Sequence, residues 1–170
     1  RWDAGADGRC VLDPLCDSLP TLLTPGGFAL IVHSEFTGVE ATLSRLREAD
    51  LKASCTHIGF DRLCQDPDAV IAEHRLWGAP HIAIGGLSAD YFQPGGVARF
   101  VQELQAVAPR IRAAGMDFSY HNHNHEFKRI EQGRTWLSLL YETAPADLLK
   151  AELDTYWVTA GGGSPEAWIR

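Results

Sequence analysis

The densest group of chemically active side chains in this 170-residue sequence is a histidine-rich segment that begins at residue 120. It contains three of the chain's seven histidines, two amides and one carboxylate, in the order Tyr120-His-Asn-His-Asn-His-Glu-Phe127. In an extended chain the three histidines face one way, and Asn122, Asn124 and Glu126 face the other. The alternative interpretation is an exposed polar strand end or a stretch of affinity tag. Exposure to solvent alone does not require this composition, and a tag is not expected in the interior of a sequence. We therefore interpret the segment as part of a functional site.

A second polar group, Glu152-Leu-Asp-Thr-Tyr-Trp157, follows a little later. Asp154 lies 28 residues after Glu126, about one βα repeat, so the two carboxylates are expected at the carboxyl ends of neighbouring parallel strands. Two close carboxylates repel unless a cation or a shared proton stabilises them. With histidines beside them, a divalent metal is the simpler solution, and mixed oxygen and nitrogen donors suit Mn²⁺, Co²⁺, Zn²⁺ or Mg²⁺. For Asp154 alone, a turn or helix cap is the alternative.

The elements that must position these residues follow from alternating apolar runs and helical patterns. Strands are expected over residues 28–33, 37–40, 51–58, 79–84, 116–123 and 148–157, and helices over residues 41–50, 66–76, 97–114 and 135–142. The first 27 residues are broken by proline and glycine, so they are expected to be irregular or to form a short helix. The alternation predicts an α/β fold of βα units on a parallel sheet of about five or six strands.

The composition is that of an ordinary globular protein with an acidic balance. The 15 Lys and Arg residues against 22 Asp and Glu residues give a net charge of −7, and 45% of residues are hydrophobic. This balance argues against a protein that grips nucleic acid over a wide face. Because the sequence shows neither a membrane-spanning run nor the order of a signal peptide, we expect no membrane association and a cytoplasmic location. The four cysteines form no C-x-x-C pair and are expected to be reduced.

Together, the two polar groups resemble the sugar phosphate isomerase/epimerase family, the xylose-isomerase-like barrels related to endonuclease IV. The resemblance is carried by Tyr-His-Asn-His-x-x-Glu-Phe at 120–127, Leu-Asp-Thr-Tyr-Trp at 153–157, and the segment at 160–169. Earlier segments at 36–40, 51–57 and 76–82 also fit. We therefore expect residues 1–35 to be an irregular segment without a family match and residues 36–170 to be a partial barrel domain.

This resemblance implies a (β/α)8 TIM-barrel-like fold, sugar or sugar phosphate chemistry, and a divalent metal at the carboxyl ends of the strands. The implied reaction is isomerisation or epimerisation of a sugar, sugar phosphate or keto-sugar by proton abstraction next to a carbonyl. Glu126 and Asp154 are the implied metal ligands, with His121 or His123 as alternatives to Glu126. The implied catalytic residues are His123 and His57, and the implied substrate contacts are His121, Asn122, Glu40 and Trp157.

The resemblance also implies an incomplete barrel. Relatives complete the metal shell with a histidine from the seventh strand and a glutamate from the eighth, both beyond Arg170, so the chain is expected to be about two thirds of a barrel. One alternative is a non-catalytic fragment that needs a partner, or a second copy of itself, to cover the open sheet edge. A dehydratase or lyase would use the same proton abstraction. An endonuclease-IV-like phosphodiesterase shares the fold but is disfavoured by the net charge of −7.

Overall fold

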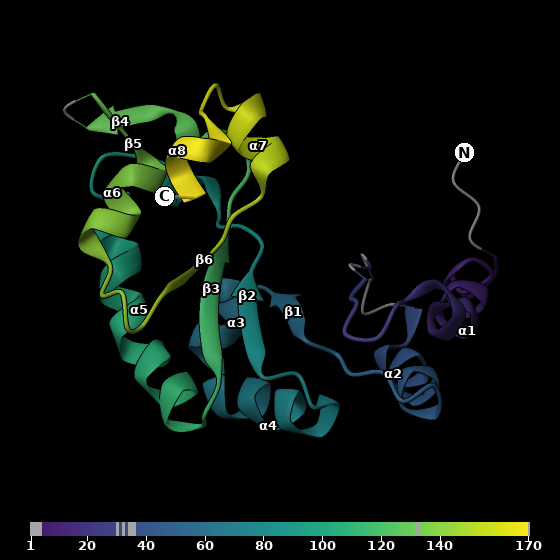
Figure 1. Cartoon of the computed structure of the whole chain (residues 1–170). Helices are drawn as coiled ribbons and strands as arrows, with labels where there is room; N and C mark the ends of the chain where they lie inside the picture. Colours follow the sequence, from purple (N-terminus) through teal and green to yellow (C-terminus); the bar gives the residue numbers. More distant parts are fainter. Residues whose placement is uncertain (1–4, 30, 32, 34–36, 132, 170) are drawn as a thin grey trace. The chain divides into compact units, whose positions relative to one another are not determined.

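The computed structural model describes residues 5–29, 31, 33, 37–131 and 133–169 (Figure 1). The chain divides into two compact units, Arg1–Ala53 and Ser54–Arg170. The division falls later in the chain than residue 35, where the irregular segment was expected to end. The histidine-rich segment and the Glu152–Trp157 group both lie in the second unit, so that unit positions the candidate site.

The described residues of the first unit include α1 (Leu12–Leu22) and α2 (Val39–Glu48), which contact each other. The short helix anticipated within the first 27 residues is α1. It buries three side chains spaced for one helical face, and α2 buries one; these are Leu12, Cys16, Leu19 and Leu43. Arg45 of α2 reaches back to α1 and forms ion pairs with Asp13 at 3.2 Å and Asp17 at 2.6 Å.

The strand expected over residues 37–40 is wrong. Val39 and Glu40 form the first turn of α2, because Gly38 adopts a left-handed conformation (φ 79°) that turns the chain directly into the helix. Glu40 therefore does not end a strand, and the position at a strand mouth expected for it as a substrate contact is not realised. In the strand expected over 28–33, residues 30 and 32 lie outside the described residues, and the other four are not in a strand.

The second unit is built on a sheet of four parallel strands in the order β1-β2-β3-β6. The strands are β1 (Cys55–Ile58), β2 (His81–Ile84), β3 (Asp117–His121) and β6 (Lys150–Glu152). Five or six parallel strands were expected, and the described residues contain four. A separate antiparallel pair is formed by β4 (Arg129–Glu131) and β5 (Arg134–Thr135). The two segments that reduce the number are 28–33, whose described residues form no strand, and 37–40, which leads into α2.

Helices follow the strands in a βα order. They are α3 (Phe60–Gln65), α4 (Pro67–Trp77), α5 (Gly96–Ala113), α6 (Trp136–Thr143), α7 (Thr155–Ala160) and α8 (Pro165–Ile169), with 3-10 turns η2 (Ala89–Tyr91) and η3 (His125–Phe127). The helix expected from residue 66 is confirmed: the Asp66 side chain accepts a hydrogen bond from Ala69 N at 3.0 Å, and Pro67 opens the helix. No helix in the described ranges is both long and apolar enough to cross a bilayer.

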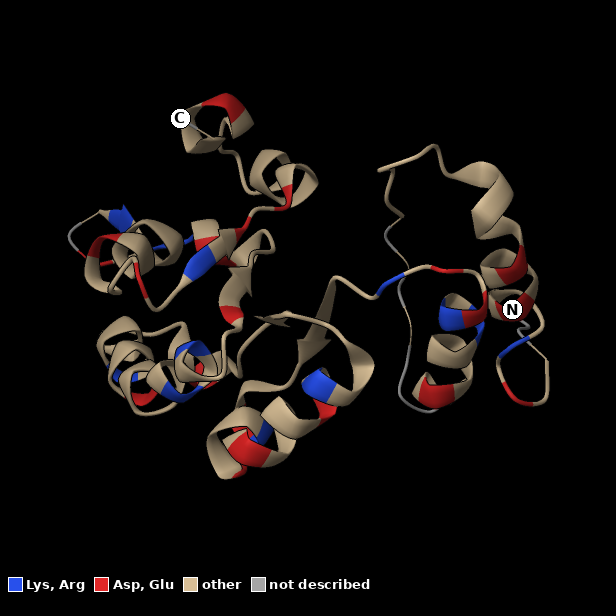
Figure 2. Cartoon of the chain, turned by 60° about the horizontal axis from the view of Figure 1, so that its bottom comes forward, with Lys and Arg blue, Asp and Glu red and all other residues tan. Residues whose placement is uncertain are grey.

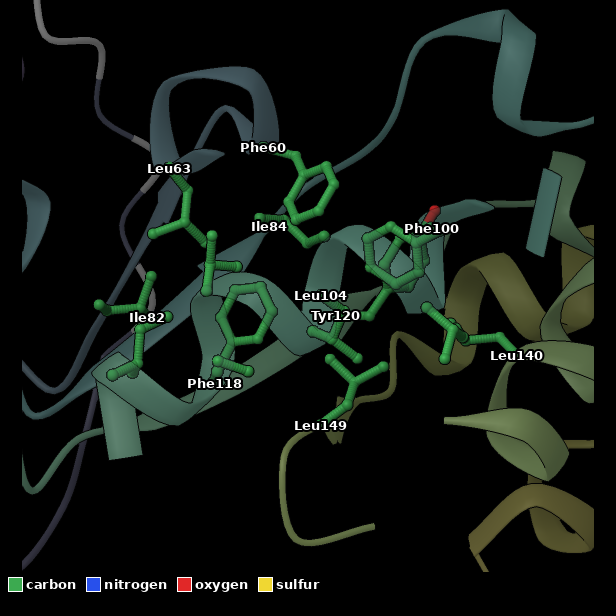
Figure 3. Packing of buried hydrophobic residues seen from close by; sticks show 14 of the residues in the cluster. Phe60, Leu63, Ile82, Ile84, Phe100, Leu104, Phe118, Tyr120, Leu140 and Leu149 are labelled. Carbon is green, nitrogen blue, oxygen red and sulfur yellow. The ribbon is translucent and has the colours of Figure 1, made fainter. Parts of the chain in front are cut away.

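The core lies between the sheet and its helices. The long amphipathic helix expected over 97–114 is confirmed as α5, which buries the face that contains Phe100 and Leu104. Figure 3 shows Phe100 beside Tyr120 of β3, and the centroids of their rings are 6.0 Å apart. Trp136, the first residue of α6, is fully buried next to Tyr120 and donates its indole N–H to the carbonyl of Tyr91 at 2.7 Å. This aromatic group directly underlies the histidine-rich segment that follows β3.

Replacing Trp136 with alanine is expected to lower the free energy of unfolding by about 3–5 kcal/mol, because it leaves a large cavity and an unpaired carbonyl. Leu76→Ala, at an exposed position of α4, is the matched control, expected to change stability by about 0.5 kcal/mol or less. Denaturant unfolding followed by circular dichroism measures both. Equal losses in the two variants would contradict this description of the core.

A second prediction concerns His74 of α4, which is fully buried. Its Nδ1 donates to the Val70 carbonyl at 2.8 Å, and its Nε2 lies 2.6 Å from the Thr56 hydroxyl. Burial lowers the pKa of His74 below its ordinary value of 6.5. Below pH 6.5 the unfolded chain therefore binds more protons than the folded chain. The contribution of neutral His74 to the free energy of unfolding is fully present above pH 6.5 and is lost as the pH falls.

We expect the free energy of unfolding to decrease as the pH falls below 6.5, and His74→Gln to make that decrease shallower. Urea titrations at a series of pH values measure both slopes. A slope that His74→Gln leaves unchanged would show that this histidine does not contribute.

Candidate functional site

The polar residues singled out in the sequence gather at the carboxyl ends of the parallel strands. His57 lies in β1, the histidine-rich segment begins at the end of β3, and Glu152 ends β6. His121 and Glu152 are register partners on adjacent strands. The carboxyl edge is where parallel α/β sheets build their sites. The segments that contain Glu126 and Asp154 follow the neighbouring parallel strands β3 and β6, as the sequence predicted.

Three of these side chains converge into a cluster that we call the His57–His121–Glu152 site. His57 Nε2 lies 3.0 Å from each carboxylate oxygen of Glu152, and His121 Nδ1 lies 4.0 Å from Glu152 Oε1. The centroids of the two imidazole rings are 4.8 Å apart. One donor atom from each residue lies within 4.8 Å of the other two, a spacing that can hold a metal ion.

The His57 ring occupies space that is open because residue 85 is glycine. A Cβ at this glycine, which directly follows β2, would lie 3.0 Å from His57 Nδ1, closer than ordinary van der Waals contact. A side chain at this position would therefore displace the His57 ring from the place where it meets His121 and Glu152.

His121 is the more enclosed histidine of the cluster. Burial is the main cause that lowers its pKa, and the neighbouring His57 lowers it further, whereas Glu152 and Asp154 act in the opposite direction. Its Nε2 lies 3.9 Å from Asp154 Oδ2. With its pKa below 6.5, the imidazole is neutral at pH 7 and offers a lone pair, the form in which histidine binds metals.

Glu126 lies in η3 and is completely buried. Its Oε1 accepts a hydrogen bond from the Tyr120 hydroxyl at 2.8 Å, and its Oε2 accepts one from the His123 backbone N–H at 2.9 Å. Burial, and then the charge of Glu126, raise the pKa of Tyr120, so this hydroxyl remains protonated and donates. His125 Nε2 is 3.4 Å from Oε1. Both oxygens of the carboxylate are thus already held by the protein.

Asp154 caps α7, as the alternative interpretation anticipated. Its Oδ1 accepts a hydrogen bond from Trp157 N at 3.1 Å, which leaves Oδ2 facing His121. Glu126 instead gathers with His123 and His125 in a second group of potential ligands. Among the described residues, no such group contains both Glu126 and Asp154, the pair of metal ligands implied by the resemblance.

Asn122, expected to contact substrate, is buried and clasps the neighbouring strand end. Its side-chain oxygen accepts a hydrogen bond from Asp154 N at 2.9 Å, and its side-chain nitrogen donates to Asp154 O at 3.2 Å. This two-bond contact joins the segment after β3 to the segment after β6. We call it the Asn122–Asp154 clasp.

His123 and Trp157 form the apolar side of the site. Their ring centroids are 5.3 Å apart, and the His123 ring also stacks on His125 at 5.6 Å. His123 Nδ1 is buried and has no hydrogen-bond partner in the described part of the chain, although the side chain as a whole is half-buried. The proton of this imidazole is therefore not fixed by an acceptor at Nδ1.

Sequence reasoning placed Glu152 in the second polar group but gave it no role. The structure places it at the centre of the His57–His121–Glu152 site. The sequence did contain a signal for Glu152. Residues two apart on a strand share a face, so Glu152 and Asp154 are expected on the same face of the sheet. The resemblance directed attention to Asp154 alone.

The glycine-rich segment after α7 packs against the histidine-rich segment. A Cβ at Gly161 would lie 2.6 Å from the Phe127 ring, and one at Gly163 would lie 2.8 Å from it. Trp168 of α8 contacts the same ring edge-on, with centroids 5.6 Å apart. Two regions on which the resemblance rests are therefore in direct contact.

This arrangement of strands, helices and carboxyl-edge residues is that of a partial (β/α)8 barrel. Two crystal structures of sugar phosphate isomerase/epimerases from Parabacteroides distasonis ATCC 8503 have the same fold, with TM-scores of 0.66 and 0.67 and sequence identities of 20% and 18%. In each case the match covers 76% of this chain, but only 51% and 57% of the crystallised chains. This chain therefore spans little more than half the length of those proteins.

The comparison confirms the expected fold class and, at the level of fold, the resemblance to sugar phosphate isomerase/epimerases. Neither a protein-family model nor a curated protein sequence matches the chain.

Replacing Asn122 with alanine is expected to lower the free energy of unfolding by about 1–3 kcal/mol, because the Asp154 N–H and carbonyl lose their partners. Asn124→Ala is the matched control, since Asn124 is exposed and its side chain makes no cap hydrogen bond. Thermal and denaturant unfolding measure the difference. If both variants are equally stable, the clasp does not hold the two strand ends together.

Proposed function

We propose that the chain is the metal-binding and proton-transferring part of a sugar isomerase or epimerase that acts next to a carbonyl group. The observation that carries this proposal is the convergence of His57, His121, Glu152 and His123 at the carboxyl edge of a sheet. The same fold occurs in two proteins described as sugar phosphate isomerase/epimerases. A parallel-sheet edge lined by imidazoles and carboxylates supplies both ligands and proton carriers.

The donor atoms fit a divalent ion. Two imidazole nitrogens and a carboxylate oxygen form a mixed set that suits Mn²⁺, Co²⁺ or Zn²⁺, and they lie close enough together to share one ion. When bound, such an ion polarises the substrate carbonyl and acidifies the neighbouring C–H.

His123 is the residue best placed to move the proton. Its backbone is fixed by Glu126, and its ring packs against Trp157, so its position is set from two sides. Its Nδ1 is buried without a hydrogen-bond partner among the described residues and lies 4.0 Å from Glu126 Oε1, so Nε2 is the ring nitrogen that accepts the proton from the substrate carbon and returns it. Return to the adjacent carbon, with the hydroxyl proton passing to the former carbonyl oxygen, gives an isomer. Protonation of the same carbon on its opposite face, which needs a second proton donor on that face, gives an epimer. Trp157 offers a flat apolar surface to the C–H face of a sugar ring.

The charge distribution suits a small substrate better than a nucleic acid. Figure 2 shows Lys and Arg interspersed with Asp and Glu along the helices instead of gathered by sign. Several arginines are also neutralised by partners on the same surface, as in Arg62 with Glu73, Arg110 with Asp68 and Arg134 with Glu142. This supports a sugar-sized substrate over the phosphodiesterase alternative.

The proposal predicts that the chain exchanges the hydrogen next to a sugar carbonyl with solvent. The protein, supplied in turn with Mn²⁺, Co²⁺, Zn²⁺ and Mg²⁺, is incubated in D₂O with aldoses, ketoses, keto-sugars and their phosphates. Proton NMR then measures loss of the signal at the carbon next to the carbonyl. We expect at least one substrate to exchange, and His123→Gln to slow exchange by at least about 100-fold, the usual contribution of a positioned acid–base group.

His81→Ala is the control, because His81 is in β2 and its ring contacts Ser119 of β3, away from the carboxyl edge. Its exchange rate is expected to equal that of the wild type. The absence of exchange with every sugar and every metal would overturn the proposal, as would an unchanged rate in His123→Gln. Products that have lost water or a carbon fragment would assign the reaction to a dehydratase or lyase.

A further inference from the structure

His125 occupies a position that the motif Tyr-His-Asn-His-x-x-Glu-Phe leaves open. Its ring nevertheless lies inside a row of four aromatic rings, Phe92, His125, His123 and Trp157, which we call the aromatic row. The centroids of successive rings are 4.5, 5.6 and 5.3 Å apart. Phe92 ends the 3-10 turn after β2, His123 and His125 follow β3, and Trp157 lies in α7 after β6. The aromatic row therefore joins segments that follow three of the four parallel strands.

The plane of the His123 ring depends on its neighbours. The χ2 torsion of histidine has broad minima, so the side chain alone does not fix this plane. The ring meets Trp157 at 50° and His121 at 80°, whereas it stacks on His125 with only 16° between the two planes. Its Nδ1 side faces Glu126, with 4.0 Å between Nδ1 and Oε1. Among the rings that contact His123 in the described residues, only His125 is close to parallel, so only His125 presents a flat face to it.

The His125 ring is itself held in place from the core. Phe92 packs against it edge-on, at an angle of 88° between the planes. The Phe92 ring in turn contacts the fully buried Trp136, with centroids 5.1 Å apart. On its polar side, His125 Nε2 lies 3.4 Å from Oε1 of the buried Glu126. A ring that is restrained on both sides can restrain the ring that stacks on it.

We propose that His125 is a positioning residue, whose stacked ring holds the His123 imidazole in the plane from which Nε2 takes the substrate proton. This inference rests on the function proposed above, in which His123 carries that proton. Proton transfer requires the two heavy atoms to come within hydrogen-bond reach, and a small misplacement of the carrier slows the reaction. His125 acts through His123 and has no contact with the reacting atoms in this proposal.

Histidine combines two properties at position 125. Its flat ring stacks on His123, and its Nε2 lies beside the Glu126 carboxylate. Phenylalanine retains the flat ring and loses the nitrogen, whereas alanine loses both. Leucine fills much of the same space without a flat face. These three substitutions therefore separate the stacked ring from the nitrogen and from the filled volume.

NMR of the whole chain without substrate tests the ring orientation. Nuclear Overhauser effects between the ring protons of His123 and Trp157 report whether the two rings keep their contact. We expect these signals in the wild type and in His125→Phe, and their loss in His125→Ala and His125→Leu. Asn124→Ala is the matched control, because the neighbouring Asn124 is exposed, and it is expected to retain them. Circular dichroism establishes which variants fold, and His125→Leu serves if the alanine variant does not.

The deuterium-exchange assay then tests the role in the reaction. We expect His125→Ala and His125→Leu to lower kcat by about 10-fold, because the proton carrier is no longer oriented. Their KM is expected to stay within about twofold of the wild type, since ground-state binding of the sugar is unchanged. His125→Phe is expected to restore kcat to within about threefold, and Asn124→Ala to match the wild type. A general loss of structure would not produce this division between kcat and KM or this rescue by a flat ring.

The positioning role and the proposed function fail in different ways. Exchange by the wild type that proceeds at the same rate in His125→Ala and His125→Leu retains the function and rejects the positioning role. A His125→Phe variant as slow as His125→Ala also rejects it, because the nitrogen and not the stacked ring would then be required. If the ring contact depends on His125 but the wild type exchanges no sugar, the orientation of His123 by His125 stands and the function is rejected.

Discussion

The candidate site depends on one buried contact, the clasp between the Asn122 side chain and the backbone of Asp154. Strands β3 and β6 pair only as far as His121 and Glu152, so beyond that point no ladder hydrogen bonds hold the two chain segments together. The amide replaces the missing ladder, since one side chain satisfies both the N–H and the carbonyl of its neighbour. It thereby fixes His121 and His123, on either side of Asn122, relative to Glu152 at the end of β6 and Asp154 just after it.

A second constraint supports the histidine-rich segment from below. Glu126 is a carboxylate in a fully buried position, where an unpaired charge would be very costly. Tyr120 makes this tolerable, because its ring belongs to the aromatic core around Phe100 and Trp136 and its hydroxyl bonds to the carboxylate. The core thus supports the site through Tyr120 and also through Phe92, whose ring packs against both Trp136 and His125. The second oxygen of Glu126 fixes the His123 backbone, so core packing determines where the proposed proton carrier lies.

Much of the second unit could be predicted from the sequence. The helical period of α5, the Asp66-Pro67 start of α4 and the apolar runs of β1, β2 and β3 are strong local signals, and all are confirmed. The apparent strand near Val39 failed because a left-handed Gly38 overrides the local β-preference. The carboxyl edge was predictable from topology, but the side chains that converge there were not. The contact of His57 with Glu152 across two intervening strands and the open space at Gly85 are determined by the folded backbone.

The contact of Phe127 with Gly161 and Gly163 has a consequence for how the protein is made. A ribosome releases the chain from its N-terminus, and segments fold as their partners emerge. The loop that carries Glu126 would emerge before Gly161 and Gly163, which contact Phe127. Until those glycines emerge, the Phe127 ring would lack this contact. The histidine-rich segment is therefore among the last parts of the sheet edge to reach its final packing.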